Sequence, residues 1–143
     1  MKYMGLDIGS KTIGIAVSDD LGWTAQPVTT IMRKKRDDDF RQIADLIDEY
    51  DISEIIVGLP KNLDGTIGKS AKKVIEFADF LMGHLNIPIS YWDERMSTKV
   101  VTRTLIEADV SRKKRKKVVD KLAAAYILQG YLDYKEFHRD KLQ

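Results

Sequence analysis

The amino-acid sequence predicts an α/β protein built on a mixed β-sheet, with helices on the faces of that sheet. Two β-rich runs, "KYMGLDIG" and "TIGIAVSD", flank a Gly-Ser-Lys turn near the start of the chain and predict an antiparallel hairpin. A third strand is expected within "WTAQPVTTIM". Helical and strand patterns then alternate along the chain, which indicates parallel strands in the core of the sheet.

The segments after the third strand predict a helix, a buried strand and a second helix. An acidic cluster at 37–39 opens an amphipathic stretch, where early acidic residues suit the positive end of a helix. The run "EIIVGLP" is short and wholly apolar, which is typical of a strand buried on both faces. The segment "SAKKVIEFADFLMGHL" again has apolar residues at helical spacing.

A second strand and helix unit completes the predicted sheet. The run "IPISYW" predicts a strand that ends at Asp93-Glu94-Arg95, and residues 97–108 predict a helix that Ser97 could cap. The basic run 112–117 is expected to be a linker. The segment "VVDKLAAAYILQGYLD" then predicts a last helix, whose small residues would let it approach the sheet closely.

Length and composition indicate a single domain over residues 1–143. A chain of this size can bury a sufficient core without disulfides or structural metal. The absence of cysteine excludes disulfides, thiolate zinc sites and a cysteine nucleophile. Because no apolar run approaches the roughly 18 residues of a membrane span, and the N-terminus lacks a signal-peptide pattern, we expect a soluble cytoplasmic protein with no membrane partner.

Charge is unevenly distributed along the chain. Residues 1–94 contain 11 lysines and arginines and 16 acidic residues, whereas residues 95–143 contain 13 lysines and arginines and 6 acidic residues. A segregated basic surface is a plausible footprint for nucleic acid, and the basic run 112–117 carries much of it through Lys113, Lys114, Lys116 and Lys117. A solvated connector remains the alternative for this run, because blocks of like charge are usually solvated.

Three carboxylates are candidates for one site. Asp7 lies towards the end of the first strand, Glu94 follows the last strand, and Asp120 lies near the start of the final helix. Ligands of open α/β sheets collect outside the carboxyl ends of the strands, so the fold could gather all three. Clustered carboxylates repel one another unless a proton or a cation offsets the repulsion, and Mg²⁺ or Mn²⁺ suits oxygen ligands.

Each of these carboxylates also has a purely structural alternative. Asp7 could accept hydrogen bonds from amides of the hairpin turn. Glu94 could pair with Arg95 or Lys99 on the surface. Asp120 could be a favourable charge near a helix N-terminus. The sequence alone leaves these alternatives open.

Four collinear motifs resemble the YqgF family of pre-16S rRNA nucleases and Holliday junction resolvase homologues. They are "GLDIGSKTIGIAVSD", "EIIVGLPKNLDGT", "DERMSTKVV" and "VDKLAAAYILQGYL", and the resemblance spans Tyr3 to about Tyr134. It implies an RNase H-like fold with a five-stranded mixed sheet whose first three strands are antiparallel. In this fold, helices cover both faces of the sheet. The resemblance also implies a metal-dependent nuclease whose three acidic residues correspond to Asp7, Glu94 and Asp120.

The same motifs suggest groups that bind the nucleic acid. We expect Lys61, Asn62 and the Gly65-Thr66 backbone to hold a phosphate beside the metals, helped by the positive end of the next helix. Lys11 and Arg95 flank the acidic residues and could contact the same strand. Asp93 is expected to support Glu94 from the opposite face of the strand. Turn formation alone is the alternative for this loop.

The predicted function is phosphodiester hydrolysis, with Asp7, Glu94 and Asp120 as catalytic residues and metal ligands and with precursor rRNA as the favoured partner. Two alternatives remain open. One is a Holliday junction resolvase that acts on four-way DNA, and the other is a non-catalytic nucleic-acid-binding assembly factor. The sequence does not distinguish RNA from DNA, Mg²⁺ from Mn²⁺, endonuclease from exonuclease, or monomer from homodimer.

Overall fold

The computed structural model describes residues 1–94 and 112–142, with the side chains of residues 1–94 and 119–138. The predicted helix over 97–108, together with Arg95, lies outside the described residues. The elements are β1 (Tyr3–Ile8), β2 (Thr12–Ser18), β3 (Ala25–Met32), α1 (Arg36–Tyr50), β4 (Glu54–Leu59), α2 (Lys69–His84), β5 (Ile89–Asp93) and α4 (Arg112–Leu142). Each predicted strand within the described residues is present, as are all helices predicted there.

All five strands form one mixed sheet in the order β3-β2-β1-β4-β5. The β1–β2 and β2–β3 pairs are antiparallel, whereas β1–β4 and β4–β5 are parallel. The predicted sheet, with its first three strands antiparallel, is therefore confirmed. The carboxyl ends of β1, β4 and β5 consequently meet along one edge, and this edge is where Asp7 and Glu94 lie.

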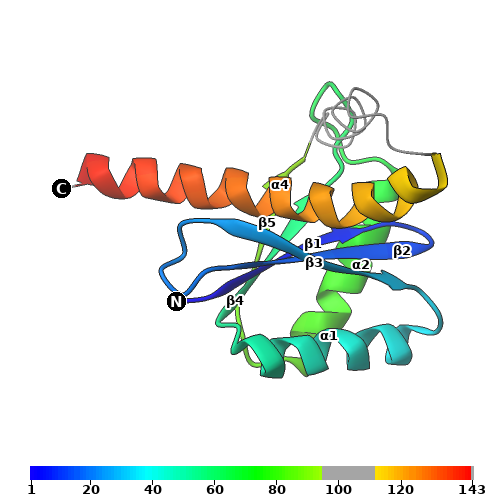
Figure 1. Cartoon of the computed structure of the whole chain (residues 1–143). Helices are drawn as coiled ribbons and strands as arrows, with labels where there is room; N and C mark the ends of the chain where they lie inside the picture. Colours follow the sequence, from blue (N-terminus) through cyan, green and yellow to red (C-terminus); the bar gives the residue numbers. More distant parts are fainter. Residues whose placement is uncertain (95–111, 143) are drawn as a thin grey trace.

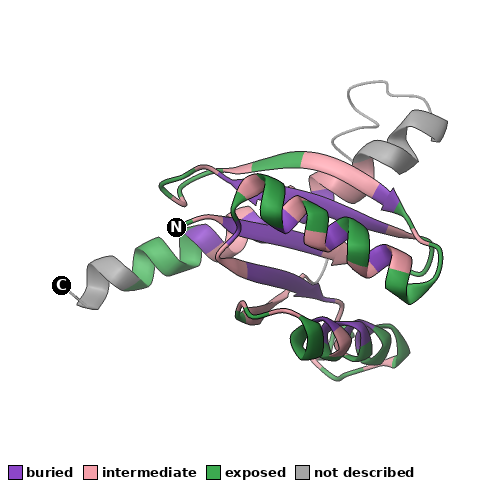
Figure 2. Cartoon of the chain, turned by 90° about the horizontal axis from the view of Figure 1, so that it is seen from below, coloured by how far each residue is buried: buried purple, intermediate pink, exposed green. Residues whose placement is uncertain are grey.

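Helices cover both faces of the sheet, as predicted (Figure 1). The face that packs against α1 and α2 carries the larger apolar core, which includes Leu6, Ile15, Ile43, Val57 and Leu81. On the other face, α4 crosses the sheet (Figure 1) and buries a smaller cluster around Ala124, Ile127 and Leu128. Figure 2 views the molecule from the side of α1 and shows the buried strands behind that helix. This division places one long helix against the same face as Asp7, near the end of β1, and Glu94, which follows β5.

The final helix begins earlier than predicted. The basic run 112–117 was expected to be a linker, but the helix α4 already starts at Arg112. Lysine and arginine are good helix formers, so a run of like charges in a first helical turn needs no break in the backbone. The side chains of Lys113, Lys114, Lys116 and Lys117 lie outside the described residues, so their predicted contacts with nucleic acid stay predictions.

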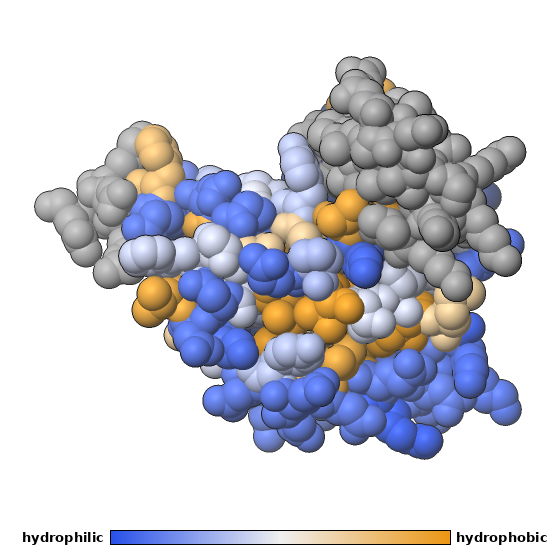
Figure 3. Space-filling view, viewed as in Figure 1, coloured by the Kyte–Doolittle hydropathy of each residue, from blue (hydrophilic) through white to orange (hydrophobic). Residues whose placement is uncertain are grey.

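The outer surface of the α1 layer is largely hydrophilic (Figure 3). This follows from its amphipathic sequence, in which Ile43 and Ile47 are buried and charged residues occupy the outer side. Within the described part of the chain, no helix combines the length and the apolar character that crossing a membrane requires.

Candidate active site

Asp7 lies at the end of the hairpin that opens the chain. It pairs with Gly14 of the neighbouring strand β2 and is half-buried. The turn between the strands is closed by backbone, since the Gly9 amide donates to the Thr12 carbonyl at 2.8 Å. The Asp7 side chain is hydrogen-bonded to Glu94. Asp7 therefore faces another carboxyl group, which the turn-forming alternative does not explain.

Glu94 reaches Asp7 from two strands away. It follows β5 directly, and its backbone amide donates to the Leu59 carbonyl at the end of β4, at 3.3 Å. The side chain lies over Gly58, where an added Cβ would stand only 2.7 Å from Glu94 Oε2. Glycine at position 58 thus provides the space in which the Glu94 carboxyl group reaches the centre of the sheet edge.

Asp120 lies on α4, close enough to Asp7 for its charge to raise the pKa of that carboxyl group. Thr12 Oγ1 donates a 2.7 Å hydrogen bond to Asp120 Oδ2, which ties the helix to the start of β2. The backbone contact is also close, because an added Cβ on Gly14 would lie 1.8 Å from the Asp120 carbonyl oxygen. Since α4 begins at Arg112, Asp120 lies more than two turns inside the helix, and the helix-start alternative is wrong.

The pKa values of Asp7 and Glu94 are both raised by their surroundings. Burial, followed by the charge of Asp7 and the hydrogen bond to Asp7, raises the pKa of Glu94 to about 8. Burial and the charge of Asp120 raise the pKa of Asp7 to about 6, while the hydrogen bond from Glu94 opposes this rise. Both directions fit a protonated Glu94 that donates to an ionised Asp7.

The metal-free protein is expected to lose stability as the pH rises from roughly 5 to 8. Glu94 has a pKa of about 8 in the folded protein against an ordinary value of 4.5. Within this window the folded protein keeps a proton that the unfolded chain has released, so raising the pH favours unfolding. Urea unfolding in a chelating buffer at several pH values measures this slope. In Glu94→Gln the slope should be flatter, and identical slopes would contradict the raised pKa of Glu94.

The donor set suits a hard divalent cation. Among the residues that the structure describes, no three acidic or histidine side chains already converge as a metal site. Asp7 and Glu94 instead hydrogen-bond to each other, and a cation could replace the bonding proton at the same oxygens. All the available ligands are carboxylate oxygens, which Mg²⁺ and Mn²⁺ prefer over nitrogen or sulfur.

A family model described as "RuvX: Holliday junction resolvase" matches residues 1–134. The chain belongs to the RuvX family. This confirms the resemblance to the YqgF family that the four motifs indicated. A relative from Clostridium botulinum (strain Hall), named "Putative pre-16S rRNA nuclease", is 56% identical over 133 residues, which cover 93% of this chain and 97% of the relative. A Halothermothrix orenii relative of the same name is 56% identical over 134 residues, which cover 94% of this chain and 96% of the relative.

Solved resolvase structures share the fold of this RuvX-family chain. RuvC of T. thermophilus, in complex with a Holliday junction substrate, has a TM-score of 0.57 at 14% identity, covering 95% of this chain and 96% of RuvC. The Fowlpox virus resolvase in complex with Holliday junction DNA has a TM-score of 0.54 at 17% identity, and the match covers 94% of this chain and 98% of the viral resolvase. These likenesses confirm the predicted RNase H-like architecture.

The loop after β4 holds its polar side chains in an internal network. Asn62 Nδ2 donates to Thr66 Oγ1 at 2.9 Å, and Thr66 Oγ1 in turn donates to Asp64 Oδ1 at 2.7 Å. The loop returns through Gly65, whose φ of 89° is a conformation that favours glycine. Asn62 and Thr66 therefore shape this loop, whether or not they also contact a phosphate.

The predicted binding lysines differ in exposure. Lys11 is exposed on the β1–β2 turn, where its carbonyl accepts a 2.9 Å hydrogen bond from the Arg33 amide. Lys61 is half-buried at the start of the loop after β4. Both lysines follow strands that end at the edge where the carboxylates lie. Their phosphate contacts stay predictions.

The structure adds Arg33 and Asp39, which the sequence analysis did not place near the site. Arg33 Nε donates to Asp39 Oδ2 at 3.1 Å, and Arg33 Nη1 donates to the Gly9 carbonyl at 2.8 Å. Asp39 is fully buried. The pair thus fixes the turn that follows Asp7. A signal was present, because Asp39 is in phase with buried Ile43 and Ile47, and a charge on an apolar helix stripe needs a partner.

Asp39→Asn is expected to destabilise the protein by about 2 kcal/mol, because it leaves the Arg33 guanidinium without its counter-charge. The cost stays below that of a fully enclosed pair, since the Arg33 side chain is 23% exposed and can be hydrated. Urea unfolding measures the change. Asp37→Asn is the matched control, because Asp37 is exposed in the same helical turn. Equal stabilities of the two variants would show that the ion pair contributes little.

Proposed function

We propose that this chain is a divalent-metal-dependent nuclease that cleaves the 5′ region of precursor 16S rRNA. Membership of the RuvX family and the nuclease names of its close relatives support phosphodiester hydrolysis. The single observation that carries the proposal is the hydrogen-bonded pair of carboxyl groups Asp7 and Glu94, which lies at the carboxyl edge of the parallel strands within reach of the charge of Asp120. A packing role does not require such mutually repelling groups.

In this proposal Asp7, Glu94 and Asp120 hold the cation. When bound, Mg²⁺ or Mn²⁺ supplies Lewis-acid chemistry, which lowers the pKa of water and stabilises charge on the phosphate. The protein contributes the placement of the ligands. Thr12 orients one oxygen of Asp120 by its hydrogen bond, and the glycine at position 58 leaves room for the Glu94 carboxyl group.

Binding of the substrate falls to basic and backbone groups around the same edge. Lys11 on the β1–β2 turn and Lys61 after β4 are proposed to contact phosphates, with Arg95 and the lysines of the basic run extending this track. The loop of Asn62, Gly65 and Thr66 leads into α2, and within the described part of the chain no side chain caps that helix at Gly68. Its first amides are suited to a phosphate oxygen.

The test compares two substrates in parallel. The wild-type chain is incubated with a precursor 16S rRNA 5′ fragment and with a four-way DNA junction, across Mg²⁺ and Mn²⁺ series and in a chelator. We expect metal-dependent cleavage of the RNA. Cleavage of the junction alone, by a dimer that cuts two strands symmetrically, would replace this proposal with the resolvase activity in the family description. Binding without cleavage of either substrate would leave only an assembly-factor role.

A further inference from the structure

The turn between β2 and β3 holds a tryptophan in a fixed and exposed position. Trp23 N donates to Asp19 Oδ1 at 2.7 Å, and the Trp23 carbonyl accepts a 2.9 Å bond from Gln129 Nε2 of α4. The Asp19 amide also donates to the Thr24 carbonyl at 3.0 Å. The backbone of Trp23 is thus held on both sides while its side chain is 61% exposed. Such a side chain is pre-organised for a partner.

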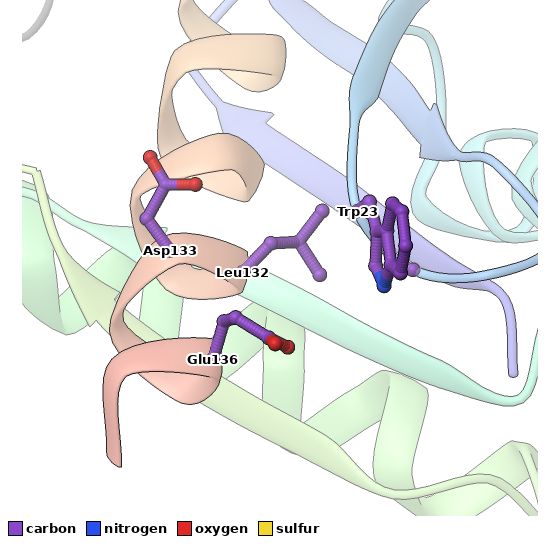
Figure 4. A pocket seen from close by; sticks show the side chains of 5 residues that line it. Trp23, Leu132, Asp133 and Glu136 are labelled. Carbon is purple, nitrogen blue, oxygen red and sulfur yellow. The ribbon is translucent and has the colours of Figure 1, made fainter. Parts of the chain in front are cut away.

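The indole stands over a hollow of about 280 Å³. We call this hollow the Trp23 pocket, and it is lined by Gly22, Trp23, Leu132, Asp133 and Glu136. Figure 4 shows Leu132 and Glu136 extending from α4 towards the side on which the indole stands. Leu21, next to the pocket along the chain, is 69% exposed. The pocket therefore combines an aromatic face, an aliphatic wall and carboxylates.

The charged residues that line the Trp23 pocket, Asp133 and Glu136, are acidic. Nearby lysines are engaged elsewhere, since Lys135 donates to the Tyr3 hydroxyl and Lys2 pairs with Asp20 at 3.7 Å. Among the side chains that the structure describes, no ion pair neutralises Asp133 or Glu136. Phosphates would be repelled here, so this surface does not suit nucleic acid.

The Trp23 pocket is also remote from the carboxylate site. Gly22 lies against the ring of Tyr3, the first residue of β1, whereas Asp7 lies near the end of that strand. Figure 1 likewise shows the β2–β3 turn beside the N-terminus, at the opposite end of the sheet from the β1–β2 turn. Two surfaces of different chemistry thus occupy opposite ends of one sheet.

We propose that the Trp23 pocket binds an arginine side chain of a basic protein segment. A planar guanidinium group stacks on an indole face and donates paired hydrogen bonds to a carboxylate, which matches Trp23 and Glu136. Proteins that coat RNA carry arginine-rich segments. If the proposed function holds, the pocket places the chain on RNA that already carries such a protein. The pocket chemistry itself does not depend on that function.

Tryptophan fluorescence tests the pocket directly. In a Trp92→Phe background Trp23 is the sole tryptophan, and a short peptide of alternating arginine and glycine is titrated into it. We expect saturable quenching of the Trp23 emission. Calorimetric titration of the same peptide into otherwise wild-type protein should show binding weakened about tenfold by Trp23→Ala and several-fold by Glu136→Gln.

The controls separate this site from general charge attraction and from the nuclease. Replacing each arginine of the peptide with citrulline should abolish binding, and Glu76→Gln, at an exposed acid on α2, should leave affinity unchanged. Asp7→Asn should bind the peptide as tightly as wild type does. Peptide binding at the Trp23 pocket can therefore be confirmed even if the chain proves not to be a nuclease. Equal peptide affinity in wild type, Trp23→Ala and Glu136→Gln would overturn the proposal. It would also be overturned if the peptide did not bind, or if single-stranded RNA quenched Trp23 and the peptide did not.

Discussion

Asp7→Asn is expected to reduce RNA cleavage at least about 100-fold, because several kcal/mol of transition-state stabilisation would depend on the proposed metal ligands. The variant should fold normally and melt at a higher temperature than wild type without metal. Asparagine removes the buried charge that Asp120 repels, and it can still hydrogen-bond to Glu94. It should also lose the increase in Tm that we expect Mg²⁺ or Mn²⁺ to give wild type through binding to the folded state.

Three measurements test this together, namely the cleavage rate, the Tm in chelator and the Tm shift with added metal. Asp45→Asn is the matched control, since Asp45 is exposed on α1, across the sheet from α4. It should retain the cleavage rate and the metal shift of wild type. An Asp7→Asn enzyme that cuts at the normal rate would refute the assignment of Asp7, whatever its stability.

The gathering of the carboxylates could be predicted because it depends on topology. Asp7 lies near the end of β1 and Glu94 follows β5, and both strands have clear hydrophobic patterns. Parallel strands place their carboxyl ends on the same edge. Asp120 comes to the same edge because the apolar and small residues of α4 pack on that face of the sheet. Each of these steps follows from a periodicity in the sequence.

Side-chain partnerships could not be predicted in the same way. The acidic cluster at the start of α1 fitted a favourable interaction with the helix dipole, yet Asp39 is buried and binds Arg33. The choice among three adjacent aspartates depends on which one faces the core, and this in turn depends on how the helix rotates against the sheet. The start of α4 is a similar case, because a block of like charges is typical of a solvated linker, yet lysine and arginine are good helix formers and α4 begins at Arg112.

Gly14→Ala is expected to destabilise the protein by at least about 4 kcal/mol, because the new methyl group overlaps a backbone atom that cannot rotate away. The added Cβ would lie 1.8 Å from the carbonyl oxygen of Asp120, so α4 must move off β2. That movement breaks the Thr12–Asp120 hydrogen bond and opens the cluster of Ala124 and Leu128. Stability and cleavage should therefore fall together.

Gly83→Ala provides the matched control, since an added Cβ there meets no atom within 4 Å. Gly83 lies inside α2, where alanine favours the helix, so this variant should gain about 0.5–1 kcal/mol. Urea unfolding measures the stability of Gly14→Ala and of Gly83→Ala.

A Thr12→Val variant separates the loss of the Thr12–Asp120 hydrogen bond from the loss of packing between α4 and β2. Thr12→Val loses the hydrogen bond to Asp120 without the steric overlap. It should therefore lower the cleavage rate while destabilising the protein less than Gly14→Ala does. If Gly14→Ala were as stable as wild type, the close approach of α4 to β2 would be wrong, and with it the position of Asp120 beside Asp7.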